Sequence, residues 1–478
     1  MHAHESNTSI GPTASGGNGA ATPVATHANV IDLARRHGET PLAMRRAALG
    51  TVSLATMFVV YRRVLRIPQR TCWPPPRDAV TSAGAQTAAE ALCAKGGARP
   101  HGESLAFAWS TAATIEPWVE GVSFFPRILA DVEAARSSVH ILMFGWREGD
   151  VGTRMAALLE QKLADGIEVR VIVDALGSRP YFQAREMFTR LAAMGAEIVV
   201  NDVVPFDRAG LFPDGRKFVW RQDELGRADH RKLFVIDGTV AWTGGAGIED
   251  HFRDGGFHDV MVRLTGDVVR QAQAAFLTSF RGYGGPLPAG PSRHFPAPAD
   301  AGTTPIVLAQ VIPGGHVAAS QAIREQIDGA HERLDVMNPY FTDRDIVERI
   351  LAAARRGVEV RVVVSKKSNS AQATAALRHR YVELAAAGVE VRELPGTVVH
   401  AKVVVADDVV SFGTVNLDAW ALYRNSEIMM MARSPALAAL FAERLFEPDI
   451  ARSNRGEPPA GVRQRLESRM WDKLAYYL

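Results

Sequence analysis

The sequence feature that most restricts the fold of this chain is an internal repeat. Residues 166–174 read GIEVRVIVD and residues 357–365 read GVEVRVVVS, while LAAMGAEIVV at 191–200 is matched by LAAAGVEVRE at 384–393. Each Val-rich run is typical of a strand buried on both faces, and a helical pattern precedes it. Strands that alternate with helices of about ten to fifteen residues indicate βαβ units and a largely parallel sheet. We therefore expect an α/β protein with two pseudo-symmetric, βαβ-rich domains.

A polar pattern, H-x-K-x4-D, lies in an apolar run of each half and recurs 170 positions later (400 − 230). Its members are His230, Lys232 and Asp237 in the first copy and His400, Lys402 and Asp407 in the second. Because side chains alternate along a strand, we expect the histidine and lysine of each copy to face the same way. The aspartate is expected at the strand end, where a turn begins. Folded face to face, the halves would bring both copies into one active site at the domain interface.

Two imidazoles beside two ammonium groups suit the chemistry of a phosphodiester. The lysines would stabilise negative charge on the non-bridging oxygens. One neutral imidazole can attack phosphorus, and the other can protonate the leaving alcohol and later activate an acceptor. This chemistry needs no metal, and we expect neither a metal nor another cofactor.

These motifs resemble the phospholipase D superfamily, whose signature is H-x-K-x4-D-x6-G-[GS]-x-N, and the resemblance covers roughly residues 120–450. Segments such as NPYF, ARRGVEVRVVV and FHDVMVRLTGDVV resemble its bacterial cardiolipin synthase branch. The signature assigns substrate contacts to Gly245, Thr414 and Asn416. The first copy departs from it because Gly247 stands where the family often has Asn. The second copy has five residues rather than six before Gly413, which is expected to shift the residues that follow slightly.

The resemblance implies a ping-pong phosphatidyl transfer through a phosphohistidine intermediate. It assigns His230 as the nucleophile and His400 as the general acid and base. It also implies that a carboxylate about thirty residues after each histidine orients an imidazole. Asp259 (259 − 230 = 29) and Glu427 (427 − 400 = 27) occupy those places. Asp237 and Asp407 complete the catalytic motif, and they are expected to hold the strand-turn geometry rather than to touch substrate.

Composition and spacing divide the chain into seven expected segments. The first forty residues are rich in Gly, Ala, Ser, Thr and His, which is typical of disorder. Residues 205–225 have no counterpart in the second half and are expected to form a loop near the mouth of the site. The segments are a disordered tail (1–40), a hydrophobic membrane-associating segment (41–70), a linker (71–104), the first domain (105–286), a Pro- and Gly-rich linker (287–305), the second domain (306–450) and an amphipathic C-terminal tail (451–478).

Two segments are candidates for membrane contact. Residues 47–61 form an uncharged run of 15 residues, which would span about 22 Å as a helix. A full membrane crossing needs about 20 residues, so a segment that spans the membrane and one that lies on its surface both stay open. In the C-terminal tail, apolar residues at helical spacing either dock on the enzyme body or lie at a membrane interface. These residues are Leu466, Met470, Trp471, Leu474 and Leu478. The resemblance implies association with the cytoplasmic (inner) membrane of a bacterium.

The net charge of +2 does not indicate a nucleic-acid partner. The expected partners are an anionic phospholipid substrate and a membrane surface, and the oligomeric state stays open. Two other functions also stay open: a phospholipase D hydrolase or superfamily nuclease, and an inactive membrane scaffold. His251 and His258 lack metal-ligand spacing and are expected to be ordinary polar residues.

Overall fold

The structure of the protein is a computed structural model that describes residues 79–80, 106–178, 185–201, 228–286, 290–313 and 317–475. All of them belong to one compact unit, residues 73–478. The predicted N-terminal tail, the hydrophobic segment and the loop at 205–225 lie outside the described residues. Within the described part of the chain, no helix has both the length and the apolar character that a membrane crossing requires.

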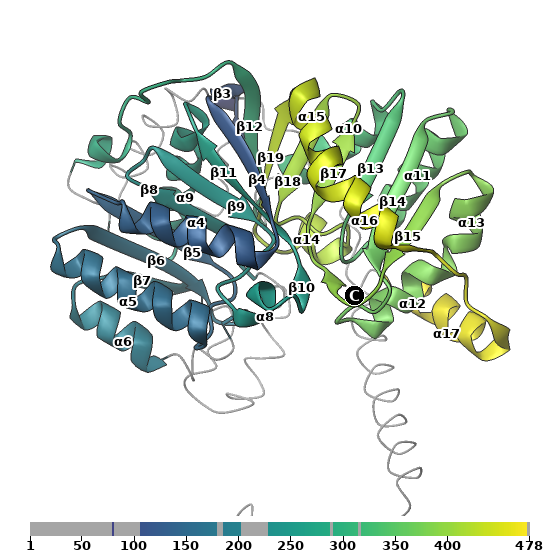
Figure 1. The fold of residues 1–478 in the computed structure, drawn as a ribbon, viewed down its shortest axis with the longest axis horizontal. Helices are drawn as coiled ribbons and strands as arrows, with labels where there is room; N and C mark the ends of the chain where they lie inside the picture. The colour runs from purple at the N-terminus through teal and green to yellow at the C-terminus, as the bar shows by residue number, and fades with distance from the viewer. Residues whose placement is uncertain are drawn as a thin grey trace, which may run out of the picture. The chain divides into compact units, whose positions relative to one another are not determined.

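The first half builds a seven-stranded mixed sheet in the order β4-β11-β9-β8-β5-β6-β7 (Figure 1). Its strands are β4 (Thr114–Val119), β5 (Ser138–Met143), β6 (Glu168–Asp174), β7 (Glu197–Asn201), β8 (Lys232–Ile236), β9 (Val240–Gly244) and β11 (Val260–Thr265). Its helices are α4 (Gly121–Glu133), α5 (Asp150–Ala164), α6 (Arg185–Ala193), α8 (Asp250–Arg253) and α9 (Val268–Gly282). β5, β6 and β7 run parallel, as the βαβ pattern predicts.

The second half builds a nine-stranded sheet in the order β20-β15-β14-β13-β17-β18-β19-β12-β3. From β12 to β15, its seven strands follow the same order as the strands of the first sheet. Its strands are β3 (Ser110–Ala112), β12 (Thr304–Val311), β13 (Arg333–Met337), β14 (Glu359–Ser365), β15 (Glu390–Leu394), β17 (Val403–Ala406), β18 (Val409–Gly413), β19 (Glu427–Arg433) and β20 (Asn454–Arg455). Its helical segments are α10 (Ala318–Asp328), α11 (Arg344–Arg355), α12 (Ala371–His379), α13 (Tyr381–Ala386), α14 (Ala419–Tyr423), α15 (Pro435–Phe441), the π-helical turn η3 (Ala442–Phe446), α16 (Glu447–Arg452) and α17 (Gly461–Lys473).

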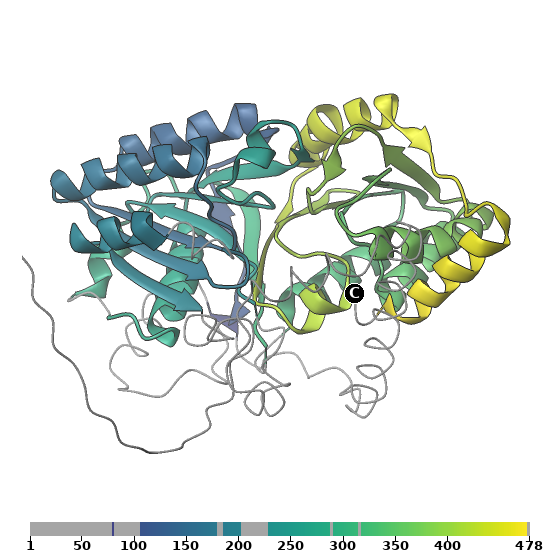
Figure 2. The same cartoon turned by 90° about the horizontal axis from the view of Figure 1, so that it is seen from below.

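Alternate residues of the central strands enter different cores, which confirms that the Val-rich runs are buried on both faces. On β8, Phe234 packs with α4, α5 and α6, whereas Leu233 packs in a core that also holds α9 and residues of the second sheet. On β17, Val404 packs toward α10 and α11, whereas Val403 enters the shared core. Helices therefore cover the outer face of each sheet (Figure 2), and one continuous apolar core joins the two halves.

Short backbone pairings also join the halves. β10 (Phe257–His258) of the first half runs parallel to β16 (Val398–Val399) of the second. Asp229, just before β8, forms a parallel bridge with Ser426, just before β19. These pairings lie next to the first and second H-x-K motifs, so the strands that meet here determine where the side chains of the motifs lie.

His258 is part of this junction, and the expectation that it is an ordinary polar residue is wrong. Its side chain is buried, with Nδ1 2.5 Å from Glu120 and Nε2 2.7 Å from Asp449 of α16. Its carbonyl accepts hydrogen bonds from the backbone N–H groups of His400 and Ala401. His258 is therefore an ion-paired link between the halves, directly beneath the second motif.

The C-terminal helix α17 docks on the enzyme body beside α12, as one of the two expectations for the tail had it. Polar residues contribute to the contact: Ser468 and Asp472 are buried, and Asp472 pairs with Arg380 and Arg344. Trp471 and Leu474 of the predicted stripe are half-buried. Leu466 is 63 % exposed, so its predicted place in a docking face is wrong.

Candidate active site

The histidines of the two motifs lie just before the strands rather than in them. β8 begins at Lys232, and β17 begins after Lys402, so the predicted alternation within a strand does not apply to His230 or His400. The reason is that each histidine pairs its backbone with the opposite half. His230 N–H donates to Ser426 at 2.9 Å, and His400 N–H donates to His258 at 2.7 Å.

The two imidazoles are held by carboxylates in a crossed arrangement. His230 Nδ1 lies 2.9 Å from Glu427 Oε1, and His400 Nδ1 lies 2.7 Å from Asp259 Oδ2. Both carboxylates are fully buried. Each therefore serves the histidine of the other half, not the histidine that precedes it by about thirty residues. Nδ1 is engaged on both rings, which leaves Nε2 of each as the nitrogen for chemistry.

Both lysines of the motifs are buried next to their histidines. Lys232 Nζ donates to the carbonyl of His230 at 2.6 Å and lies 4.8 Å from the centre of the Phe144 ring. Lys402 Nζ donates to the carbonyl of His400 and lies 2.8 Å from its Nδ1. Burial lowers the pKa of Lys232 to about 8 and that of Lys402 to about 7, against the charges of Glu427 and Asp259. The charge of each lysine also lowers the pKa of the other motif's histidine, so the four groups share one electrostatic environment.

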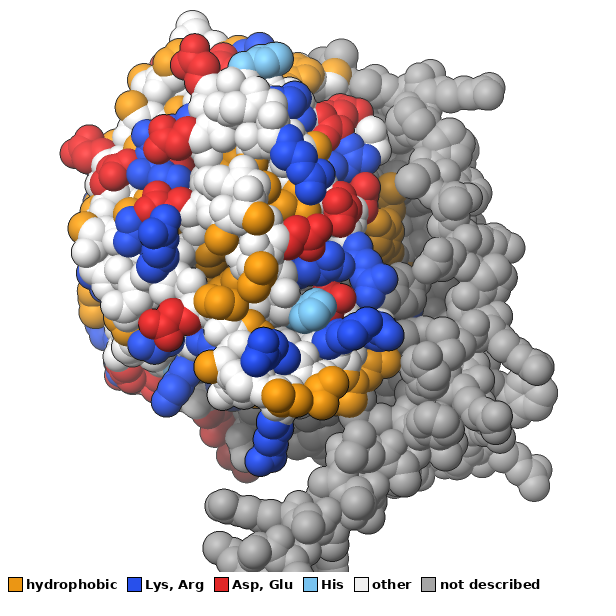
Figure 3. Space-filling view, turned by 90° about the vertical axis from the view of Figure 1, so that its right-hand side faces the viewer, with side chains coloured by type: hydrophobic (Ala, Val, Ile, Leu, Met, Phe, Trp, Pro, Cys, Tyr) orange, Lys and Arg blue, Asp and Glu red, His pale blue; other side chains and the backbone are white. Residues whose placement is uncertain are grey.

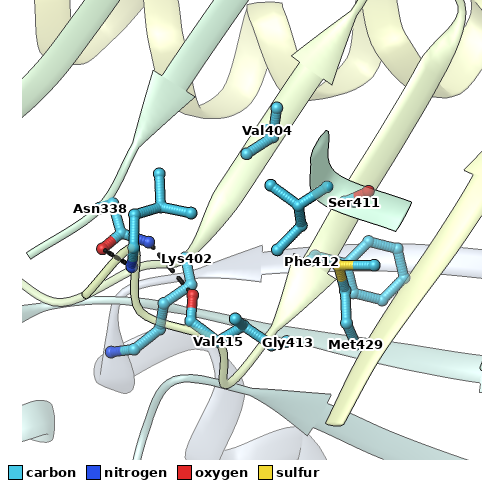
Figure 4. A pocket seen from close by; sticks show the side chains of 10 residues that line it. Asn338, Lys402, Val404, Ser411, Phe412, Gly413, Val415 and Met429 are labelled. Atoms are coloured by element: carbon cyan, nitrogen blue, oxygen red, sulfur yellow. Dashed lines mark hydrogen bonds between the residues drawn. The ribbon is translucent and has the colours of Figure 1, made fainter. Parts of the chain in front are cut away.

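Behind Lys402 lies a narrow pocket between β13, β17, β18 and β19 (Figure 4). Its walls are mostly apolar, with Val404, Phe412 and Met429 among them. The Lys402 side chain extends away from Val404 and Ser411 in this view. Because this lining is mostly apolar, the Lys402 ammonium group is favoured where it lies near His400 and the carboxylate of Asp259.

The two carboxylates differ in charge state. Burial alone would raise the pKa of Asp259, but the hydrogen bond from His400 and the charges of His400 and Lys402 outweigh it, and the pKa is lowered. Burial raises the pKa of Glu427 to about 8, despite the charge of Lys232 and the hydrogen bond from Thr414. Burial also lowers the pKa of His230, and it lowers the pKa of His400 to about 3. The environment therefore favours the ionised form of Asp259, whereas it favours the protonated form of Glu427.

The glycine-rich parts of the signature lie against these carboxylates. A Cβ atom at Gly245 would lie 2.5 Å from both carboxylate oxygens of Asp259 and 2.7 Å from the carbonyl of His400. Thr414, at the matching place of the second copy, donates its hydroxyl to Glu427. Asn416 is buried, and within the described residues its Oδ1 has no hydrogen-bond donor.

The shorter turn of the second copy leaves the strand register unchanged. Leu233 pairs with Thr243 and Val403 pairs with Phe412, in each case one residue before the first glycine of the signature. The missing residue is absorbed by the turn itself, so the expected shift of Thr414 and Asn416 is wrong.

Asp237 and Asp407 do not reach the histidines, although they belong to the motif. Both have a positive φ, 53° and 52°, at the far ends of β8 and β17. The Asp237 carboxylate accepts backbone N–H bonds from residues 136, 137 and 138, and that of Asp407 accepts them from residues 331, 332 and 333. They fasten each hairpin turn to the start of the neighbouring strand, so their place in a catalytic set is corrected to a structural one.

Sequence reasoning missed the aromatic walls of the site. The Phe144 ring lies 4.6 Å from that of His230, and the Phe252 and Phe257 rings lie 5.2 and 5.3 Å from that of His400. Phe144 directly follows β5, Phe252 lies in α8 and Phe257 begins β10, and at each of these places an apolar side chain looks like ordinary core. No spacing in the sequence distinguishes such a wall from packing.

It also missed the buried polar network beneath the first motif. Arg231 donates to both oxygens of Asp229 and to Gln310 of the second half, and Tyr283 donates to Asp229 at 2.8 Å. Asp174, at the end of β6, accepts from the backbone N–H of Asp229. A charged pair inside the motif, Asp229 and Arg231, was the available signal for this support of His230.

One cluster of metal-ligand type lies elsewhere in the described part of the first half. The ligating atoms of His140, Glu168 and His294 lie within 4.8 Å of one another. Arg170 and Arg293 already pair with the Glu168 carboxylate, which neutralises it. Burial lowers the pKa of both histidines to about 3. The cluster is a closed hydrogen-bonded group that ties η2 (Pro291–His294) to the first sheet.

Comparison with known proteins agrees with this geometry. Residues 323–448 match the family model described as "Cardiolipin synthase, PLD-like domain". A probable cardiolipin synthase of Bacillus subtilis is 28 % identical over 375 residues, covering 77 % of this chain and 72 % of the relative. A cardiolipin synthase of Listeria monocytogenes is 27 % identical over 364 residues, covering 74 % and 72 %. The crystal structure of a phosphatidylserine synthase from Haemophilus influenzae has the same fold, with a TM-score of 0.59, 13 % identity and coverage of 82 % and 100 %.

Proposed function

Because this chain belongs to the phospholipase D superfamily, we propose that it is a phosphatidyltransferase that makes cardiolipin and glycerol from two molecules of phosphatidylglycerol. The observation that carries the proposal is the crossed pair of histidines, each held at Nδ1 by a buried carboxylate of the other half. Two buried lysines complete a site suited to a phosphodiester. The identity of the two substrates is inferred from the resemblance to cardiolipin synthases.

The first half-reaction forms a phosphohistidine. Nε2 of His230 attacks the phosphorus of the donor lipid, and the bond from phosphorus to the glycerol oxygen breaks. His400, which must enter this step as the imidazolium, gives its Nε2 proton to that oxygen. Lys232 and Lys402 stabilise the charge on the non-bridging oxygens. In the second half-reaction, His400 takes the proton of the acceptor hydroxyl. The acceptor oxygen then attacks phosphorus, and the phosphorus–nitrogen bond to His230 breaks.

The charge states favour the reverse assignment of the two histidines in the free enzyme. Ionised Asp259 holds His400 as the tautomer with a free Nε2 lone pair, which is the form of a nucleophile. The pair of His230 and Glu427 retains the proton that a leaving alcohol needs. Enzyme quenched in denaturant at alkaline pH, where the phosphorus–nitrogen bond survives, and mapped by mass spectrometry decides between them. A phosphatidyl adduct on residue 230 supports the assignment by family, and one on residue 400 reverses it.

Lipid analysis tests the function itself. Purified enzyme with phosphatidylglycerol in mixed micelles should produce cardiolipin and glycerol in equal amounts, and His230→Ala or His400→Ala should abolish both. Phosphatidic acid as the sole product would make the enzyme a hydrolase. If neither cardiolipin nor phosphatidic acid forms, the lipid function is refuted.

The outward face of α17 supports contact with a membrane surface. Val462, Leu466 and Met470 follow one another at four-residue spacing and are 70, 63 and 36 % exposed, on the side of α17 opposite its docking residues. Four exposed basic residues flank this stripe: Arg463, Arg465, Arg469 and Lys473. On the face that Figure 3 shows, apolar side chains gather beside Lys and Arg. An apolar stripe between basic residues suits an interface that contains anionic lipids.

Activity on two lipid forms tests this contact. The double substitution Val462→Asp and Leu466→Asp should slow turnover on phosphatidylglycerol vesicles severalfold more than turnover on a monomeric short-chain analogue. Val122→Asp, at a position 68 % exposed on α4, is the matched control. Equal effects on vesicles and monomers would refute a role for α17 at the membrane.

A further inference from the structure

Glu249 breaks the correspondence between the two halves of the site. It lies five residues after Gly244, and Asp418 lies five residues after Gly413. Asp418 caps α14 by accepting from Trp420 N–H and Ala421 N–H, both at 2.9 Å. Glu249 precedes α8 but makes no capping bond. A buried carboxylate that does not cap its helix needs another explanation.

The Glu249 carboxylate instead pairs with Arg147 and lies 3.6 Å from His251 Nε2. Two glycines make room for it. A Cβ atom at either Gly145 or Gly247 would lie 2.8 Å from Glu249 Oε2. The departure of Gly247 from the family's Asn therefore has a physical reason, because a Cβ there would lie 2.7 Å from the Gly145 carbonyl and 2.8 Å from this carboxylate.

The cluster of Arg147, Glu249 and His251 borders the catalytic groups on two sides. Arg147 follows Phe144, whose ring contacts His230, and His251 precedes Phe252, whose ring contacts His400. Glu249 is buried, whereas the side chains of Arg147 and His251 are 49 and 34 % exposed. The cluster thus reaches from the wall of the active site to its solvent-facing rim.

Arg147 keeps donors for a ligand. Its Nε forms an ion pair with Glu249 Oε1, and within the part of the chain that the structure describes no other carboxylate pairs with the guanidinium. The Glu249 carboxylate also interacts with the charge of Lys232, so the cluster is electrostatically coupled to the catalytic site. A guanidinium that is held through Nε and has terminal N–H groups available to donate suits bidentate binding of a phosphate.

The matching place in the second half is neutral. Trp146 bridges Ile248 in the first half, and Phe341 bridges Leu417 in the second, so the residues that follow, Arg147 and Thr342, correspond. The first half therefore has a half-exposed arginine where the second half has a buried threonine. The proposed reaction needs such an asymmetry, because the acceptor lipid brings a second phosphodiester that is not the one transferred.

We propose that Arg147, held by Glu249 and flanked by His251, binds the phosphodiester of the acceptor lipid and thereby selects acceptors that carry a phosphate next to their glycerol. This inference rests on the proposed phosphatidyl transfer and adds to it a subsite outside the doubled motif. Catalysis at phosphorus remains with the two histidines and two lysines, and Arg147 positions the incoming hydroxyl.

Two water-soluble acceptors test the inference on the full-length enzyme with labelled phosphatidylglycerol as donor. Glycerophosphoglycerol carries the phosphodiester, and glycerol does not. Arg147→Gln should lower the ratio of kcat/KM for glycerophosphoglycerol to that for glycerol by roughly tenfold, mainly through KM, since a hydrogen bond to a charged group at a half-exposed site is lost. Arg147→Lys should restore part of the ratio. Arg190→Gln removes an exposed arginine of α6 that pairs with Glu160 of α5, and it should leave the ratio unchanged.

Wild-type enzyme gives a second readout that needs no variant. Its KM for glycerophosphoglycerol should rise with ionic strength more steeply than its KM for glycerol. An unchanged acceptor ratio in Arg147→Gln, together with equal salt dependence, overturns this inference alone. Wild-type enzyme that transfers phosphatidyl groups to neither acceptor, and makes no cardiolipin, overturns the proposed function and the inference with it.

Discussion

The stability of the junction beneath His400 should depend on the charge of His258. Burial alone would lower the pKa of His258, but the hydrogen bonds and charges of Asp449 and Glu120 outweigh it and raise the pKa to about 9 from 6.5. At ~1.36 kcal/mol for each pH unit, that difference corresponds to about 3 kcal/mol of stabilisation from the charged imidazole. Because the folded-state pKa is the higher one, the stabilisation is complete below pH 6.5 and is lost as the pH rises through about 9.

The substitution His258→Gln removes this dependence. The quantity of interest is the free energy of unfolding of the wild type minus that of the variant. We expect this difference to be about 3 kcal/mol larger at pH 6 than at pH 10. Urea unfolding in detergent, followed by tryptophan fluorescence, measures the difference at each pH. His331→Gln, which alters an exposed imidazole, should instead follow the wild-type curve.

Turnover gives a second measure, because the carbonyl of His258 accepts the backbone N–H of His400. The ratio of the wild-type rate to that of His258→Gln should fall as the pH rises through about 9, whereas the loss of charge on Lys232 and Lys402 lowers both rates alike. If the difference in unfolding free energy between the wild type and His258→Gln stays constant from pH 6 to pH 10, the imidazole is neutral in the folded protein. That result would refute the ion-paired link.

Three further substitutions test the assignments around the motifs. Asp407→Ala, which loses three backbone N–H bonds and places Ala at a φ of 52°, should cost about 3–4 kcal/mol of unfolding free energy in urea. Asp407→Asn should cost less and keep the turnover of the folded enzyme, and loss of that turnover at unchanged stability would restore a catalytic role. Gly245→Ala, whose Cβ would lie 2.5 Å from Asp259, should lower kcat by about 10²-fold or more, and a normal kcat would contradict the geometry. Thr414→Val, which removes the hydroxyl donor to Glu427, should lower kcat by about tenfold with little change in KM, whereas a KM effect alone would assign Thr414 to substrate binding.

The sequence predicted the fold and the identity of the four central side chains because both depend on patterns that recur. The runs at 168–174 and 359–365 are two-sided strands, and no other element suits six successive buried residues of this kind. The doubled H-x-K pattern placed His230 and His400 in one environment because repeated halves build repeated surfaces.

The pairing of the carboxylates could not be read in the same way. Sequence distance placed Asp259 nearest His230 and Glu427 nearest His400, but strand pairing across the junction reverses both. The roles of Glu249 and His258 were hidden for a related reason: their partners, Arg147 and Asp449, lie about 100 and 191 positions away. A charged residue has no periodicity that reveals its partner, and only the packing of the two halves brings these groups together.

The exchange of carboxylates across the junction has a consequence for the history of the chain. Two identical single-repeat subunits related by a twofold axis would have made the same exchange, since such an axis gives each subunit what it takes from the other. After the two copies were joined in one chain, neither could lose its motif without cost, because loss of either carboxylate impairs the histidine of the other half. Reciprocal dependence of this kind keeps both motifs under selection while positions beside them, such as Arg147 and its counterpart Thr342, diverge.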